Sequence, residues 1–336
     1  MSVLSAIKRA KLIAQRKSAV LVAIVLVAVL LLGGCGGDGE ETGARAAPAA
    51  SEFPPSEGKT LQQIAGRLPE AELVVSPAGR VYDVGSNRFA FGVFTLGGKQ
   101  VNDPDIALYF ADGLDGHARG PFPARVDSLK TAAPFRAKTT ADDPTAATTV
   151  YVVGGVKLQH KGGELTMLAL IRRDGELQAT RLPSVVIGQF ASVPDVGDRA
   201  PQIHTPTKDD VADIAEIETR IPPDTMHEQD FADVLGREPI LIVLATPQLC
   251  QSRVCGPTVD IVEEVKARFE GRAAFIHMEI YNDNDPSKGL RPEVKAFNLP
   301  TEPWAFIVDQ KGRITARFEG AFGGEELSQA LERTLD

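Results

Sequence analysis

Short runs of alternating apolar residues dominate the first half of the sequence. Within residues 105–111, Ile106, Leu108 and Phe110 alternate along the run, which is the period of a β-strand with one buried face. Similar runs predict strands at residues 71–76, 88–95, 124–129, 149–153, 165–172 and 177–180. Glycine- and aspartate-rich turns separate these runs, a pattern that is typical of an antiparallel β-sandwich. We therefore expect an immunoglobulin-like sandwich over residues 61–194.

The pattern changes at about residue 195 to an alternation of strands and helices. Strands are expected at residues 239–246, 273–281, 304–308 and 313–318, and helices at residues 258–269, 292–298 and 325–335. In the last helix Leu327, Leu331 and Leu335 follow one another at intervals of four and share a face. These elements predict an α/β domain over residues 225–336, which a polar connector, residues 195–224, joins to the sandwich.

The first 34 residues have the layout of a secretory signal peptide, with a basic segment before an uncharged run at residues 18–34. The tetrapeptide Leu32-Gly33-Gly34-Cys35 resembles the lipobox of bacterial lipoproteins, in which the cysteine is lipidated and becomes the mature N-terminus. An uncleaved signal anchor is the alternative, because 17 residues lie at the short end of the spanning range of about 17–25. Both alternatives predict a membrane-tethered, extracytoplasmic protein, and the lipobox resemblance implies a bacterial one. Residues 35–60 are then expected to be Cys35 and a flexible tether.

Charge and cysteine content narrow the possible functions. The 336 residues carry a formal net charge of −9, and removing the five cations of the signal segment lowers the charge to −14. Such an acidic chain lacks the basic footprint that nucleic-acid binding requires. Three cysteines exclude a disulfide-rich scaffold and a four-cysteine zinc site. If Cys35 is lipidated, only Cys250 and Cys255 are left, and outside the cytoplasm we expect them to form a disulfide.

The C-terminal half resembles the thioredoxin-like superfamily of thiol–disulfide reductases and peroxiredoxins. The resemblance rests on the order of the predicted elements and on Cys250-Gln-Ser-Arg-Val-Cys255-Gly-Pro257 after an apolar strand. It also rests on Pro303-Trp-Ala-Phe-Ile-Val-Asp-Gln-Lys-Gly312 and on Val196-Gly-Asp-Arg-Ala-Pro201. The resemblance implies that Pro303 is the cis-proline beside the active site and that residues 309–312 form a hairpin turn. It requires no cofactor.

Thiol–disulfide exchange needs a thiolate, and a helix N-terminus stabilises one. Cys255 is the expected thiolate because Gly256-Pro257 resembles the thioredoxin turn, and Cys250 is its expected resolving partner. The other candidate site residues are Arg253 near the thiolate, and Glu302 and Trp304, which flank Pro303 and are expected to line the cysteine pocket. The expected partners are an extracytoplasmic thiol or disulfide protein and a membrane reductant.

Three further interpretations stay open at this point. A two-cysteine peroxidase would reverse the roles of the cysteines and would need Thr246 and an arginine near Cys250. A binding or scaffold lipoprotein would carry a purely structural disulfide. A metal site would add His277 and Glu279 to the cysteines, whereas an ordinary strand histidine is the simpler interpretation of His277. Thiol–disulfide exchange is the preferred hypothesis of the four.

Overall fold

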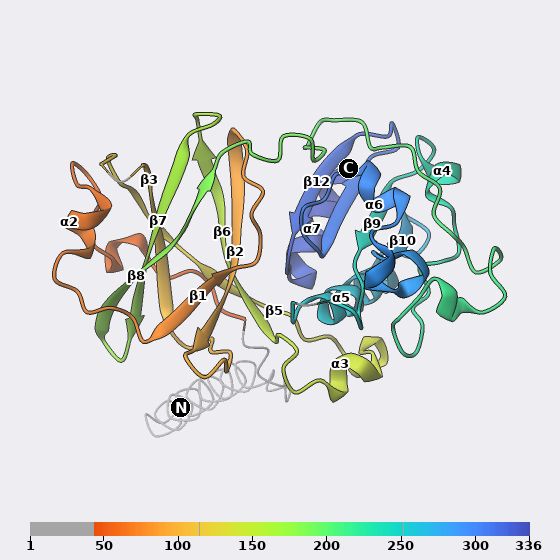
Figure 1. Cartoon of the computed structure of the whole chain (residues 1–336), viewed down its shortest axis with the longest axis horizontal. Helices are drawn as coiled ribbons and strands as arrows, with labels where there is room; N and C mark the ends of the chain where they lie inside the picture. The colour runs from red at the N-terminus through yellow and green to blue at the C-terminus, as the bar shows by residue number, and fades with distance from the viewer. Residues whose placement is uncertain (1–43, 114, 251) are drawn as a thin grey trace, which may run out of the picture. The chain divides into compact units, whose positions relative to one another are not determined.

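The computed structural model describes residues 44–113, 115–250 and 252–336 (Figure 1). Residues 43–336 form one compact unit. The expected signal peptide, the lipobox and Cys35 lie outside the described residues. Within the described ranges, no helix has both the length and the apolar character needed to cross a bilayer.

Two four-stranded antiparallel sheets are built from the first half of this unit. Their strand orders are β1-β2-β6-β5 and β4-β3-β7-β8. The strands are β1 (Leu73–Pro77), β2 (Gly85–Thr95), β3 (Asp105–Asp112), β4 (Arg119–Pro123), β5 (Arg125–Ser128), β6 (Thr149–Leu158), β7 (Glu164–Arg173) and β8 (Glu176–Val186). The seven expected strands are confirmed. Strand β4 was missed because its sequence, Arg-Gly-Pro-Phe-Pro, does not alternate.

The inner faces of the two sheets share one hydrophobic core. Phe89 of β2 and Phe110 of β3 meet across it with their ring centroids 4.6 Å apart. Phe91 follows Phe89 on the same face, as the two-residue period of a strand requires. The prediction of a β-sandwich is therefore confirmed at the level of two packed antiparallel sheets, and an immunoglobulin-like topology stays a prediction.

Residues 44–60 are not the flexible tether that their composition predicts. The backbone of Arg45 pairs with Val126 of β5, with both N–O distances at 2.8 Å. Phe53 is 4% exposed, and the guanidinium of Arg172 lies 5.3 Å from its ring centroid. The buried ring of Phe53 and the main-chain pairing of Arg45 therefore hold this segment against the sandwich, although most of its residues are small or polar.

Short helical elements accompany the sandwich and the segment that follows it. They are η1 (Ala50–Glu52), α2 (Leu61–Ala65), η2 (Ala133–Phe135), α3 (Lys138–Asp142) and η3 (Ile214–Glu216). Helix α3 lies within the stretch 135–147, whose sequence has no apolar pattern of helix or strand period.

A mixed sheet of order β10-β9-β11-β12 forms the second half of the unit. Its strands are β9 (Ile240–Leu244), β10 (Ala274–Met278), β11 (Trp304–Val308) and β12 (Ile314–Glu319). The helices are α4 (Phe231–Val234), α5 (Cys255–Arg268), α6 (Pro292–Ala296) and α7 (Gly324–Leu335), and the turns are η4 (Asn282–Asn284) and η5 (Pro286–Lys288). Strand β9 is parallel to β10 and antiparallel to β11, and β12 is antiparallel to β11. With α5 between β9 and β10, this topology is thioredoxin-like, as predicted.

Alternate residues of β9 enter different cores on the two faces of this sheet. Leu241 and Val243 pack with residues of α5 and α7. Ile240 and Leu244 pack with residues of α4 and α6 on the opposite face. Every residue of β9 is buried, as expected for a central strand covered by helices on both sides.

The sandwich and the thioredoxin-like part share a hydrophobic core. Tyr151 and Val153 of β6 point into the sandwich, whereas Val150 and Val152 pack in the cluster that contains α5 and α7. The outer face of the first sheet therefore packs against the helices of the second half. This contact explains why residues 43–336 form one compact unit, although the sequence predicts two domains.

Glu326 of α7 forms a charged contact between the two halves. Its carboxylate accepts hydrogen bonds from Arg88 at 2.8 and 2.9 Å and pairs with Arg125 at 2.8 Å. Burial raises the pKa of this carboxyl, but the two guanidinium groups outweigh burial and hold the pKa below its ordinary value. The charged form of Glu326 therefore stabilises the contact.

We expect the Glu326→Gln substitution to lower the free energy of unfolding by about 2 kcal/mol, because it removes a charge shared by two partly buried guanidinium groups. Since the folded-state pKa of Glu326 is lowered, the stability difference from wild type should shrink as the pH falls through that pKa. Urea-induced unfolding of the two proteins measures this difference. Glu325→Gln, at the exposed neighbouring position, is the matched control and should change stability by less than about 0.5 kcal/mol. Equal effects of the two substitutions would contradict the role of Glu326.

Candidate functional site

The loop between β9 and α5 carries a disulfide between Cys250 and Cys255, with the two Cα atoms 6.2 Å apart. Cys255 is the first residue of α5, as the resemblance to thioredoxin-like proteins implies. The disulfide therefore lies at the carboxyl end of β9, the edge of an α/β sheet at which ligand sites usually form. The predicted pairing of the two cysteines is confirmed.

The two cysteines differ in their exposure to solvent. Cys255 is 0% exposed, whereas Cys250 is half-buried. The hydroxyl of Ser252 lies 3.0 Å from the sulfur of Cys250 and 3.8 Å from that of Cys255. An external thiolate thus has access to Cys250 and not to Cys255. This difference in exposure favours the opposite of the expected order, in which Cys255 reacts first with the substrate.

Pro303 follows a cis peptide bond, as predicted. Its neighbour Trp304 begins β11 and pairs with Leu244, the last residue of β9. Because the cysteine loop leaves from the same end of β9, Pro303 lies at the same sheet edge as the disulfide. The predicted turn after β11 is also present, since Gly312 donates its backbone N–H to the carbonyl of Asp309 at 2.9 Å.

Glu302 lies directly before Pro303, and its carboxyl titrates near neutral pH. Burial raises the pKa of its carboxyl to about 7, against a smaller opposing effect of the Tyr281 hydroxyl, which donates a hydrogen bond at 3.3 Å. Its second carboxylate oxygen is buried and has no hydrogen-bond partner among the described residues. Glu302 is therefore suited to exchanging a proton with a nearby thiol.

Ser252, Thr301 and Glu302 line two neighbouring pockets. The larger has a volume of about 790 Å³, lies between these residues and the first sheet, and includes Phe94 and the 79% exposed Leu96. The smaller has a volume of about 340 Å³ and is lined on its far side by residues 280–299. The larger pocket is thus an apolar groove beside the cysteine loop, with the titratable carboxyl of Glu302 in its lining.

Arg253 does not have the position expected of a group that stabilises a thiolate. Its guanidinium donates a hydrogen bond to the carbonyl of Gly98 at 2.9 Å and lies 5.8 Å from the ring centroid of Phe94. Phe91 and Val93 of β2 point into the sandwich core, so Phe94 lies on the opposite face of the strand, where its ring can make this contact. Arg253 therefore attaches the cysteine loop to the first sheet.

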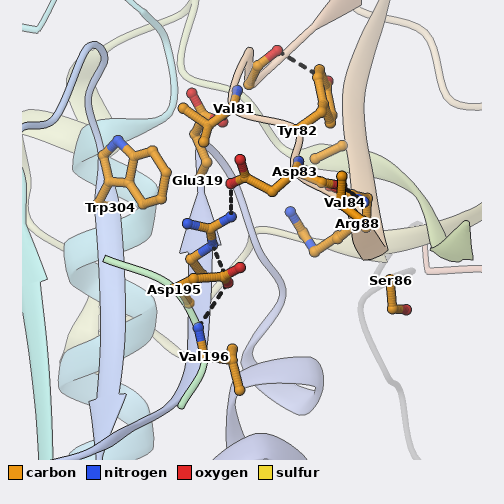
Figure 2. A pocket seen from close by; sticks show the side chains of 14 residues that line it. Val81, Tyr82, Asp83, Val84, Ser86, Arg88, Asp195, Val196, Trp304 and Glu319 are labelled. Atoms are coloured by element: carbon orange, nitrogen blue, oxygen red, sulfur yellow. Dashed lines mark hydrogen bonds and ion pairs between the residues drawn. The ribbon is translucent and has the colours of Figure 1, made fainter. Parts of the chain in front are cut away.

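Trp304 is a core residue and does not line the groove beside the disulfide. It is 1% exposed and donates its indole N–H to the hydroxyl of Thr301 at 3.1 Å. It borders a separate pocket of about 130 Å³ (Figure 2). There Arg317 pairs with Asp83 at 2.7 Å and with Asp195 at 3.2 Å. The expectation that Trp304 lines the cysteine pocket is wrong, because the side chain points into the sheet core.

Thr246 and Pro257 are both buried. Thr246 is 0% exposed just beyond the end of β9, and Pro257 is the third residue of α5. A peroxidase would need a threonine accessible to peroxide and an arginine beside Cys250. Since Thr246 is fully buried and Arg253 contacts the first sheet, neither residue is placed for that chemistry.

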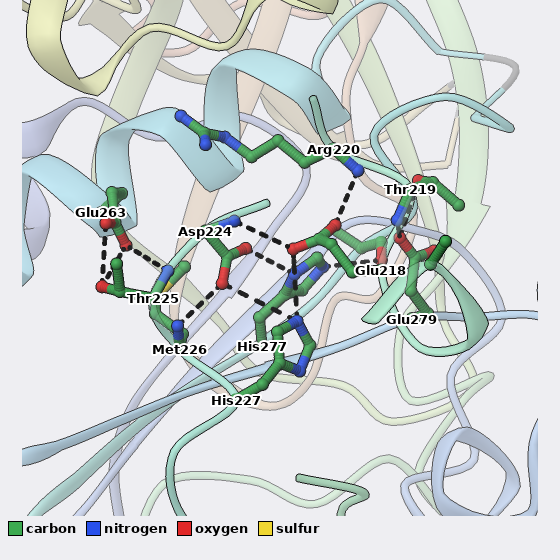
Figure 3. Close-up of polar contacts among 12 residues, drawn as sticks. Glu218, Thr219, Arg220, Asp224, Thr225, Met226, His227, Glu263, His277 and Glu279 are labelled. Atoms are coloured by element: carbon green, nitrogen blue, oxygen red, sulfur yellow. Dashed lines mark hydrogen bonds and ion pairs between the residues drawn. The ribbon is translucent and has the colours of Figure 1, made fainter. Parts of the chain in front are cut away.

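His277 and Glu279 do not join the cysteines in a metal site. His277 lies among Glu218, Asp224 and His227, and Glu279 accepts hydrogen bonds from the backbone N–H and hydroxyl of Thr219 at 2.8 and 2.7 Å (Figure 3). Burial raises the pKa of the Glu279 carboxyl, against the opposing charge of His277 and the hydroxyl of Thr219. The cluster around His277 was missed because Glu218 and Asp224 lie in the expected connector and His227 lies just beyond it, in a polar stretch without an apolar pattern.

Comparisons with known proteins found 13 similar chains among the solved structures, including two thiol:disulfide interchange proteins. One is from Chlorobium tepidum and carries the name thiol:disulfide interchange protein DsbE. It shares 14% identity over 43% of this chain and 99% of its own, with a TM-score of 0.31. The second is a thiol:disulfide interchange protein of the thioredoxin family from Chlorobium tepidum TLS, which shares 14% identity over 42% of this chain and 99% of its own, with a TM-score of 0.30. No protein-family model and no curated protein matches the chain.

We expect the Glu302→Gln substitution to stabilise the protein at pH 8 by about 1 kcal/mol and to have little effect at pH 5. The folded protein holds a proton on Glu302 up to a pKa of about 7, above the unfolded-state value, so folding becomes less favourable as the pH rises through this interval. The group keeps partial contact with solvent, which limits the size of the effect. Urea-induced unfolding at the two pH values measures it, with the exposed Glu270→Gln as control. A pH-independent effect of Glu302→Gln would contradict the raised pKa.

Proposed function

We propose that the protein is a membrane-anchored, extracytoplasmic thiol–disulfide oxidoreductase with Cys250 and Cys255 as its redox couple. The observation that carries the proposal is the asymmetry of the disulfide. The half-buried sulfur of Cys250 faces solvent, while the buried sulfur of Cys255 lies at the N-terminus of α5. This arrangement gives an accessible site of attack and a stabilised leaving group.

In the oxidising direction a substrate thiolate attacks the sulfur of Cys250 and forms a mixed disulfide. The bond between Cys250 and Cys255 breaks, and Cys255 leaves as a thiolate that the free N–H groups and the dipole of α5 stabilise. A second substrate thiolate then attacks the substrate sulfur of the mixed disulfide and releases Cys250. The substrate gains a disulfide and the cysteine pair is reduced by two electrons. The reverse sequence reduces a substrate disulfide.

Glu302 is the proposed proton acceptor for the attacking thiol. A carboxyl with a pKa of about 7 is ionised in part of the population at neutral pH, so it both takes up and releases a proton there. It lines the groove together with Ser252, whose hydroxyl contacts both sulfurs. Glu302 therefore connects the sulfur chemistry to solvent.

The proposed substrate is an extended, partly apolar polypeptide segment. The groove beside the disulfide exposes Leu96 and Val74, 79% and 44% exposed, and includes part of Phe94. The signal-like N-terminus and the lipobox at Cys35 support an extracytoplasmic, membrane-tethered location. A membrane reductant is the proposed source of electrons when the cysteine pair acts as a reductant.

We expect the reduced Cys255→Ser variant to trap a covalent complex with a disulfide substrate such as insulin. The Cys250 thiolate attacks the insulin disulfide and releases one insulin thiolate, and no resolving thiol is left to break the mixed disulfide. Non-reducing electrophoresis and mass spectrometry measure the yield. Cys250→Ser is the matched variant, and it should trap at least about tenfold less because Cys255 is buried.

Three results would contradict the proposed function. Equal trapping by both single-cysteine variants would show that the exposure of Cys250 does not control the reaction. Trapping by neither, together with unchanged thiol content in a dithiothreitol series, would favour a structural disulfide. Peroxide consumption that requires Cys250 would instead support the peroxidase alternative.

A further inference from the structure

Four buried side chains bring their donor atoms together at one edge of the thioredoxin-like sheet (Figure 3). Glu218, Asp224 and His227 come from the segment between η3 and α4, and His277 comes from β10. One donor atom from each residue lies within 4.8 Å of all the others. Their side chains are at most 3% exposed.

The distances between the imidazole nitrogens and the carboxylate oxygens bracket those around a tetrahedral metal ion. His277 Nδ1 lies 2.8 Å from an oxygen of Asp224 and 3.3 Å from one of Glu218. His227 Nε2 lies 3.2 Å from the same Glu218 oxygen and 3.7 Å from the other oxygen of Asp224. A tetrahedral zinc ion with bonds of about 2.0–2.2 Å holds its ligand atoms about 3.3–3.6 Å apart. Small side-chain adjustments therefore suffice to accommodate the ion.

Hydrogen bonds outside the cluster orient three of the four groups. The Nε2 of His277 lies 3.2 Å from the carbonyl of Ala245, so an N–H at this nitrogen leaves the Nδ1 lone pair facing the carboxylates. Glu218 accepts the backbone N–H of Arg220 at 2.7 Å, and Asp224 accepts that of Met226 at 2.8 Å. Contacts of this kind orient metal ligands in proteins and tune their affinity.

Charge balance also favours a cation at this position. Glu218 and Asp224 bring two negative charges into a site that is closed to water. The nearest guanidinium, that of Arg220, is already bound to Asp260 at 2.8 Å and to two backbone carbonyls. One protonated imidazole leaves a net negative charge, whereas a divalent cation with two neutral imidazoles leaves none. Uncompensated buried charge is strongly unfavourable.

We propose that Glu218, Asp224, His227 and His277 bind one divalent transition-metal ion, with Zn²⁺ as the ion that best matches this ligand set. Four protein ligands fill the tetrahedral coordination shell, which is the arrangement of a structural site and not of a catalytic one. The site contains neither cysteine, so it is independent of the redox couple.

The metal would fasten the segment containing residues 218–227 to β10. That segment in turn reaches the redox site at two places. Arg220 binds Asp260 of α5, and the hydroxyl of Thr219 accepts the backbone N–H of Gln248, two residues before Cys250, at 3.3 Å. The ion would therefore stabilise the segment that contacts both α5 and the cysteine loop.

Elemental analysis of the full-length protein, followed by chelation and titration with Zn²⁺ alone, tests the proposal. We expect one zinc ion per chain and a rise in Tm of at least about 5 °C when Zn²⁺ is returned to the chelated protein. Co²⁺ in place of Zn²⁺ should give the visible absorption of a tetrahedral site without a thiolate charge-transfer band. Failure of the chelated wild-type protein to bind either ion would overturn the proposal.

Matched histidine variants locate the binding site. His227→Gln should reduce the bound zinc at least tenfold, while His204→Gln, at an exposed position paired with Asp230, should retain one ion per chain. The Cys250→Ser/Cys255→Ser double variant should also retain it. Zinc retained by His227→Gln, or lost from the cysteine double variant, would place the ion elsewhere and refute this site. If His227→Gln does not fold, the cobalt spectrum of the wild-type protein decides between imidazole–carboxylate and thiolate ligands.

Discussion

The position of helix α5 depends on one buried carboxylate, that of Asp260. It accepts a hydrogen bond from Arg220 at 2.8 Å and contacts the backbone N–H of Ala137 at 3.1 Å. Arg220 also donates to the carbonyls of Phe135 and Pro222, so three separate segments of the chain meet at this point. Because Cys255 begins the same helix, the orientation of the disulfide depends on these contacts. Removing either charge would leave the other buried without its partner, which is why such a contact is costly to disturb.

The sandwich contributes directly to the proposed redox site. Arg253, between the two cysteines, contacts Phe94 of the first sheet and Gly98 in the turn that follows β2. Residues of that sheet also form one wall of the apolar groove. The hydrophobic core between β6 and helices α5 and α7 also holds the first sheet against the helix that begins at Cys255. In the proposed function, the sandwich therefore shapes what reaches Cys250 and is more than a spacer above the membrane.

The sequence pattern predicts the parts of the structure that depend on local order. Apolar runs locate the strands, and the residues around Cys255 and Pro303 locate the disulfide and the cis-proline. The pattern does not predict contacts between distant polar residues, such as Glu218 with His277, which are 59 positions apart. It also misplaces Arg253 and Trp304, because proximity in the sequence does not determine where a side chain points. Phe53 shows the same limit, since a single aromatic residue docks a segment whose composition is that of a tether.

The reduction potential of the Cys250–Cys255 couple tests the central claim most directly. Thiol labelling of the full-length protein across a dithiothreitol or glutathione series measures it. A working exchanger should have a potential between about −120 and −270 mV, with Cys250 labelled first as the pair becomes reduced. A potential below about −300 mV, with both thiols inaccessible to the label, would show that the disulfide is structural and would contradict the account.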